Sequence, residues 1–364
     1  MNRIEVRLEK KPSTSYEIYI GQDILDRMGL IITKNNWASR YILITDSNVS
    51  ALHGDRVMGT LKEMGLKVDQ IEIPAGEASK DMQTIFSIID RMIELGADRT
   101  SALIALGGGV VGDITGFVAS IYMRGIPYIQ VPTTLLAQVD SSIGGKTAID
   151  LPQAKNILGT FHQPKGVFID LAFLKTLPPR EFGNGLAEIV KCGIIDDPEL
   201  LSLLEKEAEA IRNRELPLLE KIIARTCRIK KGIVEIDEME KGLRRILNFG
   251  HTIGHAIEAE SGYSISHGEA ISVGMVAAAH ISDRLKYLPA EDRERILSLI
   301  RAIGLPDRIP PTLSTDGVSS RIKRDKKKEG DAVRFVLLKK IGIPFVNGGV
   351  PEALVRETIE ALKK

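Results

Sequence analysis

Three histidines within a short stretch carry the clearest chemical signal in the sequence. His251 and His255 are four residues apart, which places both imidazoles on one face of a predicted helix, and His267 follows shortly after. Paired imidazoles at this spacing are typical of helical metal sites, and Glu258 and Glu269 add carboxylates nearby. We expect a divalent metal such as zinc here. Spacing alone leaves the choice of ligands open, because a single histidine is more often structural.

A glycine-rich segment predicts a nucleotide site. The predicted strand over 101–106 runs into Gly107–Asp113, which shows the spacing Gly-x-Gly-x-x-Gly in front of a predicted helix. Glycines let the backbone approach a pyrophosphate, and a helix N-terminus offers unpaired N–H groups; the alternative is a plain strand-to-helix turn. The acid expected about 20 residues further on is missing. Polar residues behind other predicted strands could hold the ribose instead: Asp46, Glu77, Thr133 and Thr134.

A second glycine-bearing segment, Asp140–Thr147, predicts a phosphate-binding turn. It contains Gly-Gly-Lys, ending at Lys146, and Lys155 and Asn156 follow. The first glycine of a P-loop is absent, so we expect no nucleoside triphosphate hydrolysis. Backbone N–H groups and one ammonium can still bind a single phosphate.

Other charged residues allow simpler interpretations. Glu188 and Lys191 lie one helical turn apart, where an exposed ion pair is the simplest prediction. Lys230 and Arg244, each taken singly, are typical of surface charge. The basic run over 321–328 predicts a solvated loop or, alternatively, a segment that orders over a substrate.

The elements that must position these residues fall into two groups on either side of Pro178 and Pro179. β-rich runs alternate with helical patterns in the first half, which predicts parallel strands joined by crossover helices. The predicted strands cover 41–45, 68–73, 101–106, 128–131 and 166–170, with an N-terminal strand or hairpin over 4–20. The predicted helices of the second half cover 200–211, 217–235, 250–261, 268–286 and 289–303, with a short β-like piece over 332–338.

We therefore expect an α/β protein of two domains. A Rossmann-like parallel-sheet domain would span 1–178 and an all-α domain 179–364, with the active site in the cleft between them. The length of 364 residues fits two domains. The first domain would bind the nucleotide, and the second would hold the metal and the substrate.

Composition narrows the class of protein. Lys and Arg number 49 against 48 Asp and Glu, so the net charge of +1 offers no global attraction to nucleic acid or membranes. Apolar stretches are too short for a membrane span, and the N-terminus has no apolar signal core. Cys192 and Cys227 cannot form a disulfide framework, and we expect both to be buried. These features favour a cytoplasmic location.

Taken in order, the motifs resemble a known family over almost the whole chain. They are Gly107–Asp113, Tyr122–Gly125, Val131–Thr134, Asp140–Thr147, Lys155–Asn156, Glu188–Lys191, Leu247–Glu258 and His267–Ala270. As a set they closely resemble the 3-dehydroquinate synthase family of sugar phosphate cyclases, which acts in the shikimate pathway to chorismate and the aromatic amino acids.

The resemblance implies a lyase that converts 3-deoxy-D-arabino-heptulosonate 7-phosphate to 3-dehydroquinate and orthophosphate. NAD would oxidise C5 and be regenerated in the same turnover, while zinc or cobalt would bind the neighbouring hydroxyls. The ketone acidifies the adjacent C–H bond so that phosphate can leave. Reduction, ring opening and an intramolecular aldol step would follow.

The resemblance also implies roles for individual residues. It assigns the metal to Glu188, His251 and His267. It assigns catalysis to Lys146, Asn156, Lys191 and His255. It assigns NAD binding to Asp46, Glu77, Lys80, Gly109, Val110, Val111, Gly112, Asp113, Thr133, Thr134, Lys146, Lys155, Phe173, Leu174, Lys175 and Thr176. It assigns substrate binding to Arg124, Asp140, Lys146, Asn156, Lys191, Lys230, Arg244, Asn248, His255, Lys326 and Lys327.

One departure from the family bears on the substrate. Ala148–Leu151 stands where many members have Gly-Val-Asn-His, so another sugar phosphate cyclase is an alternative. A metal-dependent polyol dehydrogenase, which would release reduced cofactor, and a non-catalytic NAD or sugar-phosphate sensor are further alternatives. The resemblance implies a homodimer, with Arg124 acting across its interface, and a small sugar phosphate as the substrate; we expect neither nucleic acid nor a membrane as a partner.

Overall fold

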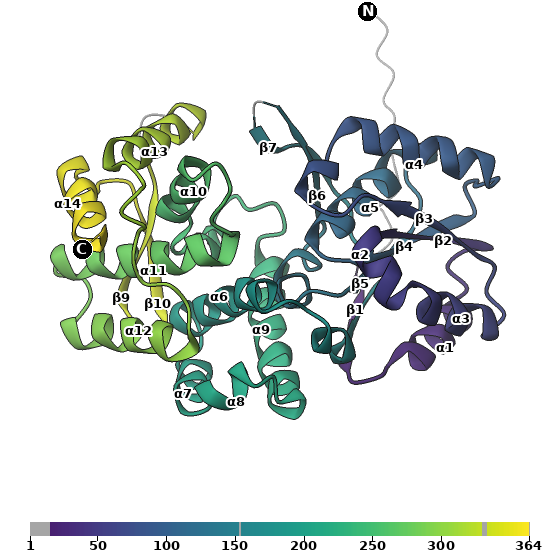
Figure 1. Ribbon diagram of the computed structural model, residues 1–364, viewed down its shortest axis with the longest axis horizontal. Helices are drawn as coiled ribbons and strands as arrows, with labels where there is room; N and C mark the ends of the chain where they lie inside the picture. Colours follow the sequence, from purple (N-terminus) through teal and green to yellow (C-terminus); the bar gives the residue numbers. More distant parts are fainter. Residues whose placement is uncertain (1–14, 153, 330–332, 364) are drawn as a thin grey trace, which may run out of the picture.

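Six parallel strands form the sheet of the N-terminal half, as predicted (Figure 1). The computed structural model describes residues 15–152, 154–329 and 333–363, without the side chains of 324–329. The order across the sheet is β1-β8-β5-β4-β2-β3. The strands are β1 (Glu17–Gly21), β2 (Arg40–Asp46), β3 (Val68–Ile73), β4 (Ser101–Gly107), β5 (Tyr128–Pro132) and β8 (Gly166–Asp170).

Helices cover both faces of this sheet, and its central strands are buried along nearly their whole length. Every residue of β4 is buried, which is the pattern of a parallel strand covered on two sides. Leu103 and Ala105 pack in one cluster, and Ile104 and Leu106 pack in another on the opposite face. The main helices of this half are α1 (Leu25–Asn35), α3 (Asp55–Glu63), α4 (Met82–Glu94) and α5 (Gly109–Ile121).

The strand order places a switch point between β2 and β4. The chain runs from β2 outward to β3 and then returns to β4 on the other side of β2. Asp46 ends β2 and Gly107 ends β4. Ligands of open α/β sheets bind at the carboxyl ends of strands where the order reverses, so this edge is the natural nucleotide site.

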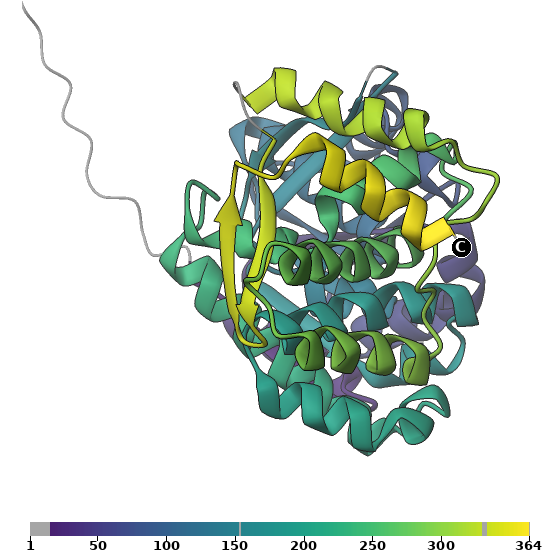
Figure 2. The same cartoon turned by 90° about the vertical axis from the view of Figure 1, so that its left-hand side faces the viewer.

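Within the described residues, the second half is helical apart from one hairpin (Figures 1 and 2). Its helices are α6 (Pro179–Ile195), α7 (Pro198–Lys206), α8 (Ala208–Arg212), α9 (Leu216–Ile236), α10 (His251–Glu260), α11 (His267–Arg284), α12 (Ala290–Ile303), α13 (Thr315–Glu329) and α14 (Glu352–Lys363). The hairpin consists of β9 (Phe335–Lys340) and β10 (Ile343–Asn347). In Figure 2 it lies in yellow beside the helices.

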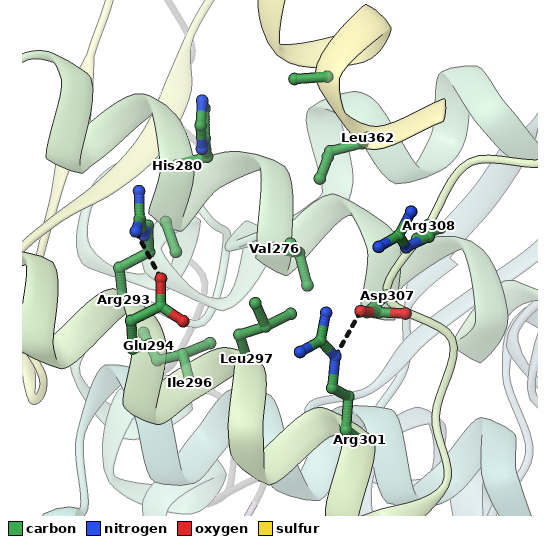
Figure 3. A pocket seen from close by; sticks show the side chains of 12 residues that line it. Val276, His280, Arg293, Glu294, Ile296, Leu297, Arg301, Asp307, Arg308 and Leu362 are labelled. Atoms are coloured by element: carbon green, nitrogen blue, oxygen red, sulfur yellow. Dashed lines mark hydrogen bonds and ion pairs between the residues drawn. The ribbon is translucent and has the colours of Figure 1, made fainter. Parts of the chain in front are cut away.

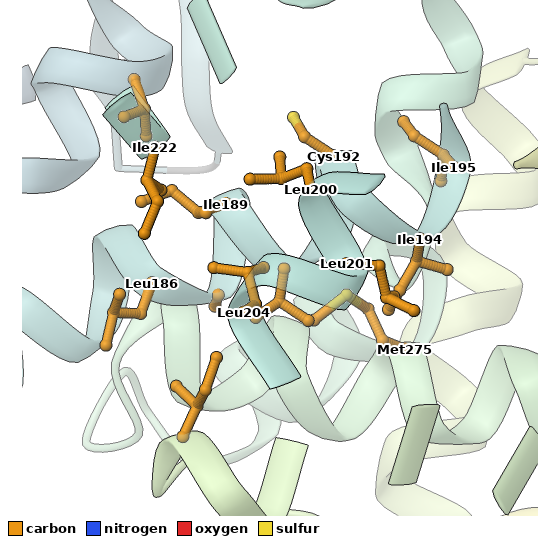
Figure 4. Close-up of a cluster of buried hydrophobic side chains, with 14 of the residues drawn as sticks. Leu186, Ile189, Cys192, Ile194, Ile195, Leu200, Leu201, Leu204, Ile222 and Met275 are labelled. Carbon is orange, nitrogen blue, oxygen red and sulfur yellow. The ribbon is translucent and has the colours of Figure 1, made fainter. Parts of the chain in front are cut away.

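The core of this half anchors α6. Leu186 and Ile189 of α6 pack in one buried cluster with Leu200, Ile222 and Met275, which come from α7, α9 and α11 (Figure 4). Pro179 stands at the first turn of α6, where its missing N–H costs no helical hydrogen bond. Packing on several sides therefore fixes the helix that carries Glu188.

Within the described residues, the expected N-terminal strand or hairpin is one strand, β1, parallel to β8, while 4–14 lie outside the description. Two other segments differ from the sequence-based expectations. The segment after Gly145 is an antiparallel hairpin of β6 (Lys146–Leu151) and β7 (Ala154–Phe161), anchored by the buried Ile149. The basic run over 321–328 lies on helix α13 and is not a loop.

None of the described helices is long and apolar enough to span a membrane. Both cysteines are free and buried, as predicted. Burial raises the pKa of each thiol to about 12, so neither is reactive near neutral pH.

Candidate functional site

Three side chains from three helices of the second half meet around one point. Oε1 of Glu188 on α6 lies 3.7 Å from Nε2 of His251 on α10 and 3.5 Å from Nε2 of His267 on α11. A tetrahedral zinc ion with bonds of about 2.0–2.1 Å separates its ligand atoms by about 3.4 Å. The spacing of these three atoms therefore suits one divalent ion.

Hydrogen bonding prepares both imidazoles for a metal. Nδ1 of His251 lies 3.2 Å from the carbonyl oxygen of Phe249, and Nδ1 of His267 lies 3.5 Å from Oε2 of Glu258. When Nδ1 donates to such an acceptor, Nε2 keeps its lone pair. The two free lone pairs then point towards Glu188.

An unpartnered oxygen supports this fit. Oε1 of Glu188 is buried and has no hydrogen-bond partner among the described residues. A buried carboxylate oxygen without a partner is costly, and a bound cation removes that cost. A second group, His255, Glu258 and His267, is also close enough to bind an ion, but it is more exposed and shares His267.

The charges around this site are strongly coupled. Burial favours a neutral Glu188, but Lys191 and the two histidines outweigh it and hold the Glu188 pKa well below its usual range. Burial, followed by the Lys191 charge, lowers the pKa of His251. Burial alone would lower the pKa of His267, but Glu188 and Glu258 outweigh it and raise that pKa to about 9.

The expectation of an exposed ion pair on α6 is wrong. Glu188 and Lys191 form an ion pair, and both side chains are only 2% exposed. A buried pair of this kind costs desolvation energy, so it is weak evidence for stability and better evidence for a site. Lys230 and Arg244, which singly suggested surface charge, are also buried.

The glycine-rich segment Gly107–Asp113 lies at the edge of the sheet where the strand order predicts a nucleotide site. Gly109–Asp113 form the first turn of α5, and no side chain caps its N-terminus. Its N–H groups are therefore available to an anion. Nζ of Lys80 lies 2.6 Å from Oδ2 of Asp113 and 2.6 Å from Oδ1 of Asn156.

The other expected NAD residues lie around this edge in different settings. Asp46 ends β2 and accepts hydrogen bonds from two backbone N–H groups. Thr133 and Thr134 follow β5, and the Thr133 hydroxyl is buried without a hydrogen-bond partner in the described part of the chain. Phe173 is buried in the core, so its side chain serves packing. Buried in the same way are Val111, Gly112 and Leu174.

A salt bridge joins the two candidate sites. Nζ of Lys155 on β7 lies 3.3 Å from Oε1 of Glu77 and 3.4 Å from Oε1 of Glu258. The same ammonium lies 4.1 Å from the centre of the Tyr263 ring. Because Glu258 also faces His267, this contact links the nucleotide edge to the metal set.

Cations gather beside the metal set. Lys230 donates to the backbone and carboxylate oxygens of Asp140, and Arg244 donates to the carbonyl oxygen of Glu238 at 2.6 Å. Lys146 begins β6 nearby. Burial, then the charges of Arg244 and Lys230, lower the pKa of Lys146 to about 8. Convergent cations of this kind suit an anionic substrate.

Several expected residues do not join these groups. Arg124 ends a short helical turn, and no ion pair of its side chain is present in the described residues. Lys326 and Lys327 lie on α13, but their side chains lie outside the described part. Glu269 pairs with Arg180 and completes the capping box of α11, so it faces away from the metal set.

Sequence reasoning missed Glu240. Its carboxylate forms an ion pair with Lys146 and accepts a hydrogen bond of 2.9 Å from Nδ2 of Asn248. In the sequence it stands in an ordinary charged stretch and offers no signal.

A cavity of about 250 Å³ lies elsewhere, between α11, α12 and α14 (Figure 3). Arg301 pairs with Asp307 there, and Arg293 pairs with Glu294. These cations are satisfied by neighbouring acids, so the cavity does not compete with the site above.

A parallel sheet with an open helix N-terminus, beside a helical region with two histidines and a carboxylate around one point, is the plan of a metal- and nucleotide-dependent enzyme. Comparison with known proteins identifies the family of this enzyme. Residues 70–184 match the model of the 3-dehydroquinate synthase N-terminal domain, and residues 185–328 match that of its C-terminal domain. The chain belongs to the 3-dehydroquinate synthase family.

Related proteins match this chain over almost its full length. The chain is 44% identical to a 3-dehydroquinate synthase of Symbiobacterium thermophilum, over 96% of this chain and 98% of that one. Its fold is similar to that of 2-epi-5-epi-valiolone synthase from Streptomyces hygroscopicus, solved with NAD+ and Zn2+. That match has a TM-score of 0.90 and 28% identity, and it covers 98% and 99% of the two chains.

A second solved relative carries a sugar phosphate analogue. It is 2-deoxy-scyllo-inosose synthase complexed with carbaglucose-6-phosphate, NAD+ and Co2+. The TM-score is 0.88 with 31% identity, covering 94% of this chain and 96% of the other. These two solved relatives are sugar phosphate cyclases.

Proposed function

We propose that this protein converts 3-deoxy-D-arabino-heptulosonate 7-phosphate to 3-dehydroquinate and orthophosphate, as a phosphate-eliminating lyase of the shikimate pathway. Family membership over the whole chain supports the reaction. The single structural observation that carries the proposal is the convergence of Glu188, His251 and His267 beside buried cations.

Glu188, His251 and His267 are proposed to hold a zinc ion, or cobalt in its place. Their spacing and the unpartnered Glu188 oxygen fit such an ion. When bound, the metal would lower the pKa of the substrate hydroxyl, and NAD would take and return one hydride at that carbon. Solved relatives that contain NAD+ with zinc or cobalt support both assignments.

The chain's own cations would bind the charged groups of the substrate. Lys146, Lys230 and Arg244 surround one region, and Asp140 fixes the ammonium of Lys230. Charge-assisted hydrogen bonds hold phosphate and carboxylate groups well. Lys191 would keep Glu188 ionised and ready for the metal.

His255 is proposed to handle a proton. Its ring centre lies 5.1 Å from that of His251 and 5.9 Å from that of His267. It is exposed, so it can exchange protons with water and substrate.

The nucleotide edge would hold NAD. The N-terminus of α5 would bind the pyrophosphate, and Asp46 or Glu77 would bind ribose hydroxyls in place of the missing Rossmann acid. Lys80 would orient Asn156, because its ammonium donates a hydrogen bond to the Asn156 amide oxygen. Thr133 and Thr134 would supply hydroxyl groups.

Assembly and location complete the proposal. We propose that the protein is a cytoplasmic homodimer in which Arg124 reaches the active site of the partner subunit. We also propose that the two domains divide at residues 178 and 179, where α6 begins. Lys326 and Lys327 on α13 would contact the substrate.

The substrate is tested by offering three compounds to the purified protein with NAD and zinc. The proposal expects orthophosphate and dehydroquinate from the heptulosonate phosphate only. Phosphate release from glucose 6-phosphate alone would indicate another sugar phosphate cyclase. Net NADH formation from an unphosphorylated polyol would indicate a dehydrogenase.

A further inference from the structure

A β-bulge in the hairpin of β6 and β7 (Figure 1) carries two residues that the proposed function uses. On either side of Asp150 the ladder pairs one residue with one, but opposite Asp150 the strand β7 has three residues, 155–157. The first two of these are Lys155 and Asn156. Bulges redirect side chains and are frequent next to active sites, so the residue opposite this one is a candidate for controlling it.

The bulge brings two consecutive side chains to one place. In a regular strand, neighbouring side chains point to opposite faces of the sheet. Here Nζ of Lys155 lies 3.3 Å from Oε1 of Glu77, while Oδ1 of Asn156 lies 2.6 Å from Nζ of Lys80. Glu77 and Lys80 belong to one short segment after β3. Both bulged residues therefore reach the same part of the nucleotide edge.

Hydrogen bonds close a ring around this bulge. The backbone N–H of Asn156 donates to Oδ1 of Asp150 at 2.7 Å, and the N–H of Asp150 donates to the carbonyl oxygen of Lys80 at 2.7 Å. The ammonium of Lys80 completes the ring, because it donates to Oδ1 of Asn156. Three residues from three segments thus fix one another, and Asp150 takes part in two of the three bonds.

The backbone of Asn156 needs this support. Its φ of 55° lies in the left-handed region, which residues other than glycine rarely adopt. Asparagine tolerates this region better than most residues, but such conformations persist where neighbouring contacts enforce them. The Asp150 carboxylate accepts the hydrogen bond of this residue's own N–H group, so it stabilises the bulge at its strained position.

The charge of Lys80 decides how the Asn156 amide is turned. Burial would lower the pKa of Lys80, but Asp113, with smaller contributions from other carboxylates including Asp150, outweighs it and holds that pKa above its usual value. The ammonium only donates hydrogen bonds, so Asn156 must present its amide oxygen to Lys80. Nδ2 is then left as a donor, and Asn156 is exposed, so a substrate oxygen can accept from it.

We propose that Asp150 is a positioning residue: it sets the bulge that aims the Asn156 amide at the substrate and the Lys155 ammonium at the nucleotide edge, without contacting either ligand. The hydrogen bond to the Asn156 N–H carries this role, and the negative charge of Asp150 is not required for it. This inference rests on the proposed function.

The test compares three variants of the full-length protein with NAD and zinc: Asp150→Ala, Asp150→Asn and Thr160→Val. The alanine variant loses the acceptor, whereas the asparagine variant keeps a side-chain oxygen and loses only the charge. Thr160→Val is the matched control, because it removes a hydroxyl contact of 2.8 Å to Thr147 in the same hairpin but outside the bulge. The Thr147 hydroxyl keeps the Thr160 carbonyl oxygen as its acceptor.

We expect Asp150→Ala to raise KM for the heptulosonate phosphate about three- to tenfold, which is the effect of one lost hydrogen bond. NAD affinity, measured by calorimetry, should fall about threefold because Lys155 is less well placed. Asp150→Asn and Thr160→Val should keep both constants within about twofold of the wild type. Zinc affinity should stay unchanged in every variant, because the bulge carries no proposed metal ligand.

A double-mutant cycle with Asn156→Ala separates positioning from a general loss of structure. If Asp150 acts on the substrate through the Asn156 amide, Asp150→Ala should raise KM much less in the Asn156→Ala background than in the wild type.

Three results would overturn the inference. Unchanged KM and NAD affinity in Asp150→Ala would remove the role. An equal defect in Asp150→Asn would make the charge the cause, and fully additive effects with Asn156→Ala would leave Asp150 a structural role only. Failure of the proposed function is distinguishable, because the wild type would then release no phosphate while the NAD affinities of the variants would still decide on the positioning.

Discussion

A methyl group added to Gly274 should separate the two helices that carry the metal-binding histidines. The new carbon would lie 2.0 Å from the carbonyl oxygen of Gly250 and 2.9 Å from the nitrogen of Gly254. Non-bonded heavy atoms rest about 3.5 Å apart, so α10 and α11 would have to move apart by about 1.5 Å. His251 lies on α10 and His267 on α11, and metal bonds tolerate changes of only about 0.2 Å.

Gly274→Ala should therefore reduce zinc affinity at least about tenfold and lower the free energy of unfolding by about 1–3 kcal/mol. Zinc affinity is measured by competition with a chromogenic chelator, and stability by urea unfolding of the zinc-free protein. NAD affinity, measured by calorimetry, should change little because the nucleotide edge lies on the sheet.

Gly232→Ala is the matched control. Gly232 lies inside α9, and an added carbon there has no neighbour within 4 Å. This exchange should raise stability by about 0.5–1 kcal/mol through helix propensity and leave zinc affinity unchanged. If Gly274→Ala bound zinc like the wild type and unfolded at the same urea concentration, the packing argument for the metal site would be wrong.

Three further predictions address single residues. His267→Ala should lose bound zinc and activity together while it keeps NAD affinity, as metal analysis and calorimetry would reveal; full activity in verified zinc-free protein would contradict the site. Burial and neighbouring cations lower the pKa of Lys146 to about 8, so its charge is present below that pH and KM should rise above it; Lys146→Arg should remove this rise, and a persisting rise would implicate another group. Lys326→Ala and Lys327→Ala should each be tested for a raised KM, with at least one expected to show it; unchanged constants in both would exclude α13 from the site.

The alternation of β-rich and helical patterns predicted the sheet. The polar residues behind the predicted strands were enough to predict its ligand-binding edge. Continuous apolar runs such as Ser101–Leu106 can be buried only between two layers of helices, and β4 is buried along its whole length. The spacing of His251 and His255 predicted a metal-binding helix. It could not identify Glu188, which forms a group with His251 and His267, because α6 meets α10 and α11 only after the chain has folded.

The remaining features depend on contacts between residues far apart in the sequence. Lys146 and Glu240 are separated by 94 positions, so nothing in either local segment signals their pairing. The pair of Glu188 and Lys191 looked like surface charge for a similar reason, because its burial is decided by the helices packed around α6. The hairpin that begins at Lys146 was missed since glycines in front of it suggested only a turn.

In the proposed reaction, oxidation and reduction cancel within each turnover. The most direct measurement is phosphate release from 3-deoxy-D-arabino-heptulosonate 7-phosphate with zinc and less NAD than substrate, while absorbance reports reduced cofactor. We expect many phosphates per NAD, dehydroquinate as the product and no accumulation of NADH. One phosphate or fewer per NAD, with NADH accumulating in proportion, would contradict it.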